Sequence, residues 1–268
     1  MDSALEPLAH SAGMALLGMS KVTTKSPSQK LRRAPRVEYV VSRKRHRRVL
    51  EVFAMALLIW NVPDLAHAQL YAGILGGVSS LSGDARSIVS SGSIAFSSYD
   101  PKNGGNLSVL IGKHFSDYFS AQGSYGWNEN DLSLSSGNSV NGTSEGYQER
   151  RSSSQQTLIG NVLVYFRARS SRLRPYLSVG TGFMHFTSAE VRLEQVMGAP
   201  TLPPRQFSSN HVVLNVPVGM DVNLGKGWAF RYTFSETISG NPVSDHLSPA
   251  GLHTFKNFQN LFGFVRRF

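Results

Sequence analysis

The residue types needed for acyl transfer occur together at one place in the chain. His185 and Thr187 lie two residues apart, and Glu190 follows three residues after Thr187. A hydroxyl nucleophile, a histidine base and a carboxylate that orients the histidine form the set that this reaction requires. Residues two apart point to the same face of a strand. The hydroxyl belongs to threonine and such spacing often arises by chance, so we predict no catalytic residue and keep this trio as an alternative.

Metal binding is the second chemistry to consider. The eight histidines show no metal-ligand spacing. Asp245, His246 and His253 share one polar segment and could meet at a divalent ion, but such segments are ordinarily solvated. The chain has no cysteine, which excludes disulfides and thiolate-bound metals. Residues 225–227, Gly-Lys-Gly, are interpreted as a turn, because no strand-loop-helix pattern surrounds them. We predict no metal and no cofactor.

The positive charge of the chain is concentrated at its beginning. Of the formal net charge of +10 on 268 residues, residues 1–68 carry +6. A basic leader more often serves targeting than nucleic-acid binding. The rest of the chain has no recognition motif and no basic residues interleaved with stacking aromatics. Nucleic acid is therefore not an expected partner.

The leader has two parts. Residues 1–42 mix Ser, Thr, Pro, Lys and Arg without an apolar period, so we predict that they are disordered, and they could precede the true translation start. Residues 43–68 follow the order of a secretory signal peptide: a basic cluster, a short apolar run, and a small-residue cleavage site at Ala66 and Ala68. The apolar run is shorter than the about 20 residues of a spanning helix. Cleavage is predicted before Gln69.

After Gln69, apolar and polar residues alternate in eight windows. The period of two is typical of strands that have a different solvent on each face. The clearest window is 211–224, where seven apolar residues occupy every second position. The other windows are 70–79, 106–115, 119–128, 157–167, 175–186 and two within 228–268. No window of helical periodicity competes with them.

The connections between these windows alternate in length. Three are short, at 116–118, 168–174 and 225–227, and four are long and polar, at 80–105, 131–156, 187–210 and 239–256. An even strand count with this alternation predicts an all-β fold over residues 69–268. The predicted architecture is an eight-stranded antiparallel up-and-down transmembrane β-barrel with short periplasmic turns and long extracellular loops. Closure of the barrel would satisfy every backbone group in lipid.

The two faces of the predicted strands indicate what fills the barrel. A soluble barrel with a ligand cavity would point its large apolar side chains inward. Here bulky apolar residues share one parity, and Gly, Ser, Asn and Gln share the other, which suits a narrow interior and a lipid-facing exterior. Arg167, Asp221 and Arg231 fall on the inward parity. A narrow interior cannot hold lone ions cheaply, so we predict that these charges pair into an ionic ladder.

The last strand carries a resemblance to a known family. Phe258, Phe262, Phe264 and Phe268 share one parity, and the chain ends Asn-Leu-Phe-Gly-Phe-Val-Arg-Arg-Phe. With its strand count and loop lengths, the chain from Gln69 resembles bacterial outer-membrane β-barrel proteins of the OmpA-like transmembrane type. The resemblance implies the outer membrane of a Gram-negative-type bacterium, contact with outer-membrane lipid and lipopolysaccharide, and insertion by the outer-membrane machinery. It also implies that Phe262, Phe264 and Phe268 form the assembly signal.

The expected function follows from a filled interior. Eight strands enclose a space that side chains can fill, and binding is commonly carried by loops on a rigid scaffold. We therefore expect a structural or surface-interaction role, with an unknown extracellular ligand. Two alternatives stay open. One is a narrow porin-like channel, and the other is a lipid A-modifying enzyme, because His185, Thr187 and Glu190 resemble in outline the His, Ser and Glu set of lipid A deacylase barrels.

Overall fold

The computed structural model describes residues 70–140 and 142–268. The predicted leader (1–42), the predicted signal peptide (43–68) with Ala66 and Ala68, and Gln69 lie outside the described residues. The elements in chain order are β1 Leu70–Leu81, β2 Asp84–Ser90, β3 Ser93–Pro101, β4 Gly104–His114, β5 Phe119–Val140, β6 Thr143–Tyr165, β7 Leu173–Met197, β8 Gln206–Gly225, β9 Trp228–Gly240, the short 3₁₀ turn η1 Ser244–His246, and β10 Thr254–Arg267. In this part of the chain, no helix is long and apolar enough to cross a membrane.

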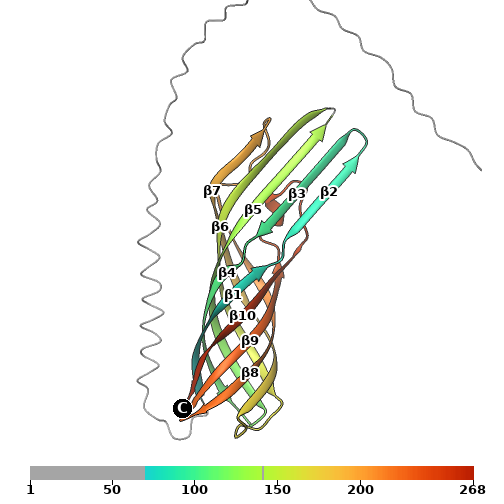
Figure 1. The fold of residues 1–268 in the computed structure, drawn as a ribbon. Coiled ribbons are helices and arrows are strands. Elements are labelled where there is room, and N and C mark those ends of the chain that lie inside the picture. The colour runs from blue at the N-terminus through green and yellow to red at the C-terminus, as the bar shows by residue number, and fades with distance from the viewer. Residues whose placement is uncertain (1–69, 141) are drawn as a thin grey trace, which may run out of the picture. The chain divides into compact units, whose positions relative to one another are not determined.

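Eight of the strands close into a ring. Its order is β1, β10, β9, β8, β7, β6, β5, β4 and back to β1, every neighbouring pair is antiparallel, and the β5–β6 pairing completes the closure. The predicted eight-stranded antiparallel barrel is confirmed. The connections 115–118, 166–172 and 226–227 lie at the same end as the C-terminus, and we call this the short-turn end (Figure 1). There the Phe268 amide donates to the Leu70 carbonyl at 2.9 Å.

Most of the residues predicted as long polar loops are strands. Residues 84–101 form the β2–β3 hairpin, which pairs through β3 with the outer part of β5. Residues 131–156 continue β5 and β6, which stay paired up to Val140 and Thr143. At about 3.3 Å per residue, the 22 residues of β5 extend roughly 70 Å. A bilayer requires only about 9–11 residues of a tilted strand. The strands therefore extend far beyond an apolar belt of that height (Figure 1).

Along β5 the chemistry of the two faces exchanges. In its first half, Phe119 and Tyr125 are exposed on the outer face, whereas Ser120 and Asn128 are buried inside. In its second half, Leu132 and Leu134 are buried inside, and serines occupy the outer parity. The alternation itself is unbroken. The first half thus suits lipid outside and a polar lumen inside, and the second half suits water outside and an apolar core inside.

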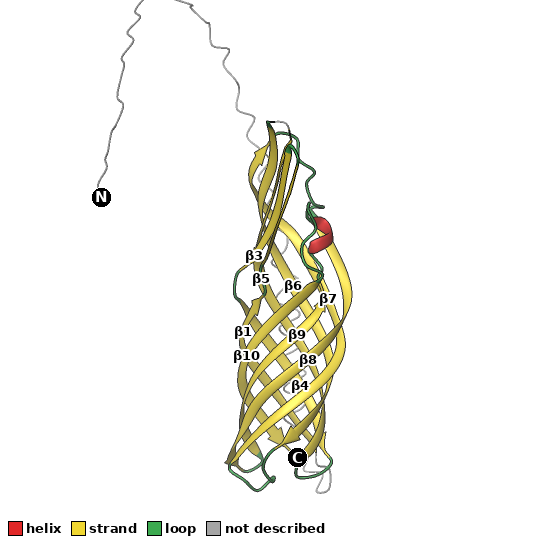
Figure 2. Ribbon diagram, turned by 90° about the vertical axis from the view of Figure 1, so that its right-hand side faces the viewer, coloured by secondary structure: helices red, strands yellow, loops and turns green. Residues whose placement is uncertain are grey.

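That apolar core fills the end of the barrel opposite the short-turn end. It combines strands with the connection 241–253, which contains η1, and Figure 2 shows η1 beside the extended strands. Its members are Leu81, Tyr99, Leu132, Leu134, Tyr147, Ile159, Met184, Phe186, Phe207, Val213, Val243, Leu247 and Phe255. Seven separate strands and one loop contribute, so no short window of sequence contains the core.

Candidate functional site

A buried ion pair joins β8 to β9 on the lumen side of the barrel wall, near the short-turn end. Asp221 and Arg231 are direct register partners in β8 and β9. Arg231 donates from Nε to Asp221 Oδ1 at 2.6 Å and from Nη2 to Oδ2 at 2.8 Å. It also donates to the Tyr165 hydroxyl at 2.8 Å and to Gln122 Oε1 at 2.6 Å. A buried pair is tolerated when its geometry is good and its remaining groups are hydrogen-bonded, as they are here.

The third charge predicted for the interior lies elsewhere. Arg167 is exposed in the connection between β6 and β7, because β6 ends at Tyr165 and its alternation ends with it. Arg174, at the start of β7, is buried instead. Its guanidinium carbon lies 3.9 Å from the centroid of the Tyr165 ring, and its Nη2 donates to the Asp117 carbonyl at 2.8 Å. The alternation of residues 175–186, extended back by one position, would have placed Arg174 inside.

Two tyrosine rings fill the lumen beside the ion pair. The guanidinium carbon of Arg231 lies 5.3 Å from the Tyr71 centroid and 5.2 Å from the Tyr176 centroid. Each ring lies over a glycine of a neighbouring strand, since a Cβ on Gly112 would collide with Tyr71 and one on Gly219 with Tyr176. The missing side chains leave the space that the rings occupy. This end of the lumen is therefore closed by side chains.

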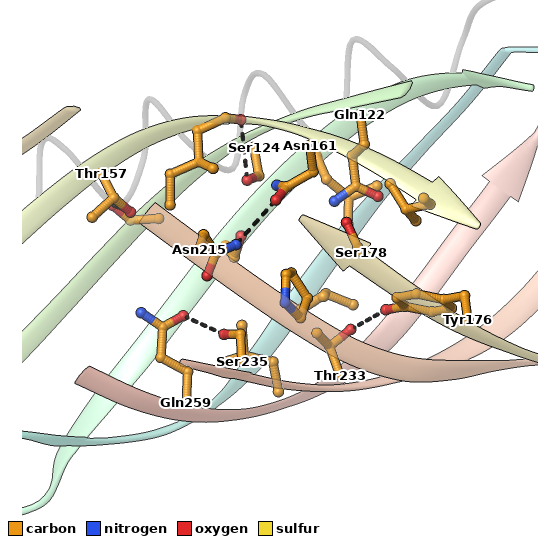
Figure 3. Close-up of a pocket in the computed structure, with 18 residues that line it drawn as sticks. Gln122, Ser124, Thr157, Asn161, Tyr176, Ser178, Asn215, Thr233, Ser235 and Gln259 are labelled. Atoms are coloured by element: carbon orange, nitrogen blue, oxygen red, sulfur yellow. Dashed lines mark hydrogen bonds between the residues drawn. The ribbon is translucent and has the colours of Figure 1, made fainter. Parts of the chain in front are cut away.

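The middle of the lumen contains a small cavity lined by both polar and apolar side chains. Its volume is about 40 Å³, and amide and hydroxyl side chains point into it from several strands (Figure 3). Asn215 donates to Asn161 Oδ1 at 3.2 Å and accepts from the Thr237 hydroxyl at 3.0 Å. One buried water needs about 10–15 Å³ by this kind of measure. The cavity therefore has room for a few water molecules and is too small for a solute.

A proline interrupts the hydrogen-bond ladder between β7 and β8 at the level of this cavity. The β7–β8 ladder pairs Leu177 with Val218 and resumes at Gly180 with Asn215. Pro217 lies between these pairs and lines the cavity. Proline has no N–H to donate to a ladder, which explains the break. The Ser178 hydroxyl at this point donates to the Val162 carbonyl of β6 at 2.9 Å.

The connection 241–253 closes the far end of the lumen. Its Val243 and Leu247 are buried in the apolar core described above. Asn241 Nδ2 donates to the Tyr99 hydroxyl at 3.1 Å and to the Leu252 carbonyl at 2.7 Å. The Ser136 hydroxyl of β5 donates to the Ser248 carbonyl at 2.5 Å. The connection is thus held to the surrounding strands by both apolar packing and hydrogen bonds.

A second buried ion pair supports this closure. Arg151 Nη1 lies 2.7 Å from Glu149 Oε1, and Arg151 Nη2 donates to the carbonyls of Pro204 and Arg205 at 2.8 and 3.1 Å. Burial raises the pKa of Glu149, although Arg151 opposes this shift. Sequence reasoning missed the pair because residues 131–156 were predicted as a loop. The parity that Tyr147, Glu149 and Arg151 share was the available signal.

His246 lies next to this pair. Its ring centroid is 4.1 Å from that of Phe207, whose ring centroid is also 4.7 Å from the guanidinium carbon of Arg151. Burial lowers the pKa of His246, and the charge of Arg151 lowers it further. Across residues 70–140 and 142–268, no group of three His, Asp or Glu side chains could hold a metal ion, and this covers His246 with Asp245 and His253.

The three side chains considered for acyl transfer have other partners. His185 Nδ1 is hydrogen-bonded to Asn210 Oδ1 at 2.7 Å, and the Thr187 hydroxyl donates to the Ser154 carbonyl at 3.4 Å. Glu190 lies 3.9 Å from Arg205. Because β7 alternates, His185 and Thr187 share the outer face and Glu190 falls on the other parity. The structure does not bring the three groups together.

The terminal aromatic residues lie on the outer face of β10. Phe262 and Phe264 are 53% and 54% exposed, which is high for phenylalanine and fits an apolar surrounding. The guanidinium carbon of Arg266 lies 5.3 Å from the Phe268 centroid and 5.7 Å from the ring of Trp228. Arg266 interrupts the apolar row and is accommodated between two aromatic side chains.

Comparison with known proteins gives one family and several similar structures. Residues 52–268 match the model of a family described as outer membrane protein beta-barrel domain. Neisserial surface protein A (NspA) is 10% identical, with 75% of this chain and 98% of that chain covered and a TM-score of 0.45. The outer membrane protein OprG from Pseudomonas aeruginosa is 13% identical, with 75% and 97% covered and a TM-score of 0.42. No curated protein matches in sequence.

Proposed function

We propose that this chain, which belongs to the outer membrane protein β-barrel domain family, acts through its outer surface and conducts no solutes. The family places the chain in the bacterial outer membrane. We further propose that residues 43–68 direct its export in a Gram-negative-type bacterium, with cleavage before Gln69. The short-turn end then faces the periplasm, and the extended strands face the exterior.

The observation that supports this function is the filled lumen. The Asp221–Arg231 pair and two tyrosine rings fill the short-turn end, and the middle has a cavity of about 40 Å³. The connection 241–253 and the apolar core fill the other end. An eight-stranded barrel of this kind has no room for a hydrated solute. A narrow porin-like channel is therefore the less favoured reading.

The extended strands supply the surface on which an extracellular ligand would bind. Strands β2, β3, β5, β6 and β7 form a continuous sheet beyond the belt (Figure 1). On its outer parity stand small or polar side chains such as Ser133, Gln148 and Ser152, together with exposed apolar side chains of the β2–β3 hairpin, namely Val89, Ile94 and Phe96. A rigid sheet loses little conformational entropy on binding. We propose that this face carries the interaction, and the ligand is unknown.

Two measurements, one on the purified protein and one on an expression host, test this function against its alternatives. In planar bilayers we expect no steady conductance steps, and large steady steps would overturn the closed lumen. For the enzyme alternative, lipid A from a host without lipid A-modifying enzymes should have the same mass with and without the protein. If lipid A lost an acyl chain when the protein was present, and the His185→Ala variant no longer caused that loss, the non-enzymatic role would be contradicted. Thr187→Val and Glu190→Gln provide matched variants of the same trio.

We also propose that the outer-membrane insertion machinery reads Phe262, Phe264 and Phe268, and that lipopolysaccharide surrounds the outer part of the belt. The exposure of Phe262 and Phe264 on the terminal strand supports the first proposal. The polar residues above the belt, such as Gln156 and Arg150, support the second, because headgroups need hydrogen-bonding partners.

A further inference from the structure

The two ends of the barrel carry opposite charge. Among the described residues, all acidic side chains except Asp117 and Asp221 lie in the half that contains the long hairpins. The short-turn end contains seven lysines and arginines that reach its surface, which we call the basic collar: Lys113, Arg167, Arg169, Arg172, Lys226, Arg266 and Arg267. Asp117 is near Arg169 at 3.6 Å, and Asp221 is bound inside by Arg231. Of the residues that the structure describes, Asp117 is therefore the only acidic side chain at the surface of this end.

The collar is interleaved with exposed aromatic residues. Phe115, 64% exposed, follows Lys113 by two positions, and Phe166, 63% exposed, precedes Arg167. Trp228 follows Lys226 by two positions and lies 5.7 Å from the guanidinium carbon of Arg266. Aromatic rings at strand ends mark the depth of lipid headgroups. In a bilayer, cations interleaved with these rings would lie at the level of the headgroup phosphates.

The charged groups of the collar reach the surface that headgroups would contact. Arg167, Arg172 and Lys226 are exposed, and the guanidinium of Arg266 lies beside the rings of Trp228 and Phe268. Arginine side chains match the oxygens of a phosphate group in both charge and geometry. Cations spread around a ring and alternating with aromatic rings fit a layer of headgroups better than one free ion, which would need donors that converge on a point.

We propose that the basic collar binds the phosphate groups of anionic phospholipids in the leaflet around the short-turn end. This rests on the placement of the barrel in a bilayer, which the proposed function shares. A basic residue near an anionic surface contributes about 1 kcal/mol, or about fivefold in affinity. The short-turn end should therefore select anionic over zwitterionic phospholipid by at least that factor.

Quenching of Trp228 by brominated lipid tests the proposal. The protein, carrying Trp127→Phe so that emission of the processed chain comes from Trp228, is purified from membranes and reconstituted into phosphatidylcholine vesicles. Dibrominated phosphatidylglycerol and dibrominated phosphatidylcholine are then compared as quenchers. We expect about fivefold preference for phosphatidylglycerol, and its loss in Lys226→Gln/Arg266→Gln. The matched variant Arg192→Gln/Lys256→Gln removes two cations of the opposite half and should keep the preference.

Three results would overturn the proposal. Equal quenching by the two lipids would show that the collar makes no selection. A preference that survives in Lys226→Gln/Arg266→Gln would place its origin elsewhere. A preference abolished by inorganic phosphate, but not by sodium chloride of equal ionic strength, would assign the site to free phosphate. Circular dichroism of the same samples reports the folded barrel, and conductance separately tests the proposed function, so the failures are distinguishable.

Discussion

Arg231 binds both carboxylate oxygens of Asp221 across the β8–β9 ladder, where the two residues are direct partners in register. The turn at 226–227 joins their strands, so the pair forms within one hairpin. Its geometry is bidentate and both side chains are almost fully buried. The pair thus combines local sequence proximity with burial that only the closed ring provides.

Breaking this pair should destabilise the barrel. Arg231→Met leaves the Asp221 carboxylate buried without its partner, and we expect a loss of about 3–5 kcal/mol in the free energy of unfolding in lipid vesicles. Lys256→Met is the matched control, because its pair with Glu236 at 2.9 Å is partly exposed. The control should cost less than about 1 kcal/mol. Equal costs for the two variants would contradict the assigned importance of burial.

The glycine beneath Tyr176 should not accept a side chain. In Gly219→Ala the new Cβ meets the Tyr176 ring and the Tyr232 carbonyl, so we expect about 1–3 kcal/mol of destabilisation. Gly123→Ala has no atom within 4 Å of the new Cβ and should be neutral or stabilising. Urea unfolding of both variants in lipid vesicles gives the comparison. A neutral Gly219→Ala would mean that the ring does not fill this level of the lumen.

The exchange of polar and apolar faces along β5 predicts that substitutions at neighbouring positions lower the free energy of unfolding by different amounts. Leu134 is fully buried in the apolar core, so Leu134→Ala should cost about 2–5 kcal/mol. Ser133, on the outer parity, should tolerate alanine within about 0.5 kcal/mol. Val218, 47% exposed on the belt, should lose about 2–4 kcal/mol on replacement by lysine near mid-bilayer. Tolerance of Leu134→Ala would indicate that residues 131–156 form a solvated loop after all.

Loss of the last residue should impair assembly. Deleting Phe268 removes the hydrogen bond that its backbone N–H donates to the Leu70 carbonyl, and the ring beside Arg266. If the terminal row is the insertion signal, most of the truncated protein should accumulate in the periplasm, as fractionation and immunoblotting would show. Phe166→Ala, which removes an exposed aromatic ring from the same end, is the control and should assemble. If the truncated protein reached the membrane in normal amounts, Phe268 would not be part of the insertion signal.

Acid should loosen the connection 241–253 through His246. Burial and Arg151 lower the pKa of His246, so its stabilising contribution is present above about pH 6.5 and is lost as the pH falls through the folded-state value. Glu149 acts in the opposite sense, because its pKa is raised. We expect faster hydrogen exchange of the connection at about pH 5.5 than at about pH 7.5, after correction for intrinsic rates. His246→Phe should reduce this difference, and an unchanged difference would exclude His246.

Local sequence was sufficient to predict the eight-stranded ring and which face of each strand points into the lumen. An apolar–polar alternation such as that of residues 211–224 indicates a strand, because a helix repeats its faces every 3.6 residues. The short turns between the windows then require neighbouring strands to be antiparallel. The same parity placed Asp221 and Arg231 inside. Arg167 was misplaced because a parity argument cannot tell where a strand ends. The turn between β6 and β7 decides that point, and it leaves Arg174 as the buried cation.

The extended strands and the closed outer end were decided by tertiary structure. Residues 131–140 are rich in serine, so their composition resembles a solvated loop, and the apolar members Leu132, Leu134 and Val140 are too few to define a strand alone. They become a core only when Phe186, Phe207 and other side chains from distant strands reach the same level. Burial free energy depends on contact with residues far apart in the chain, and no window of sequence contains those contacts.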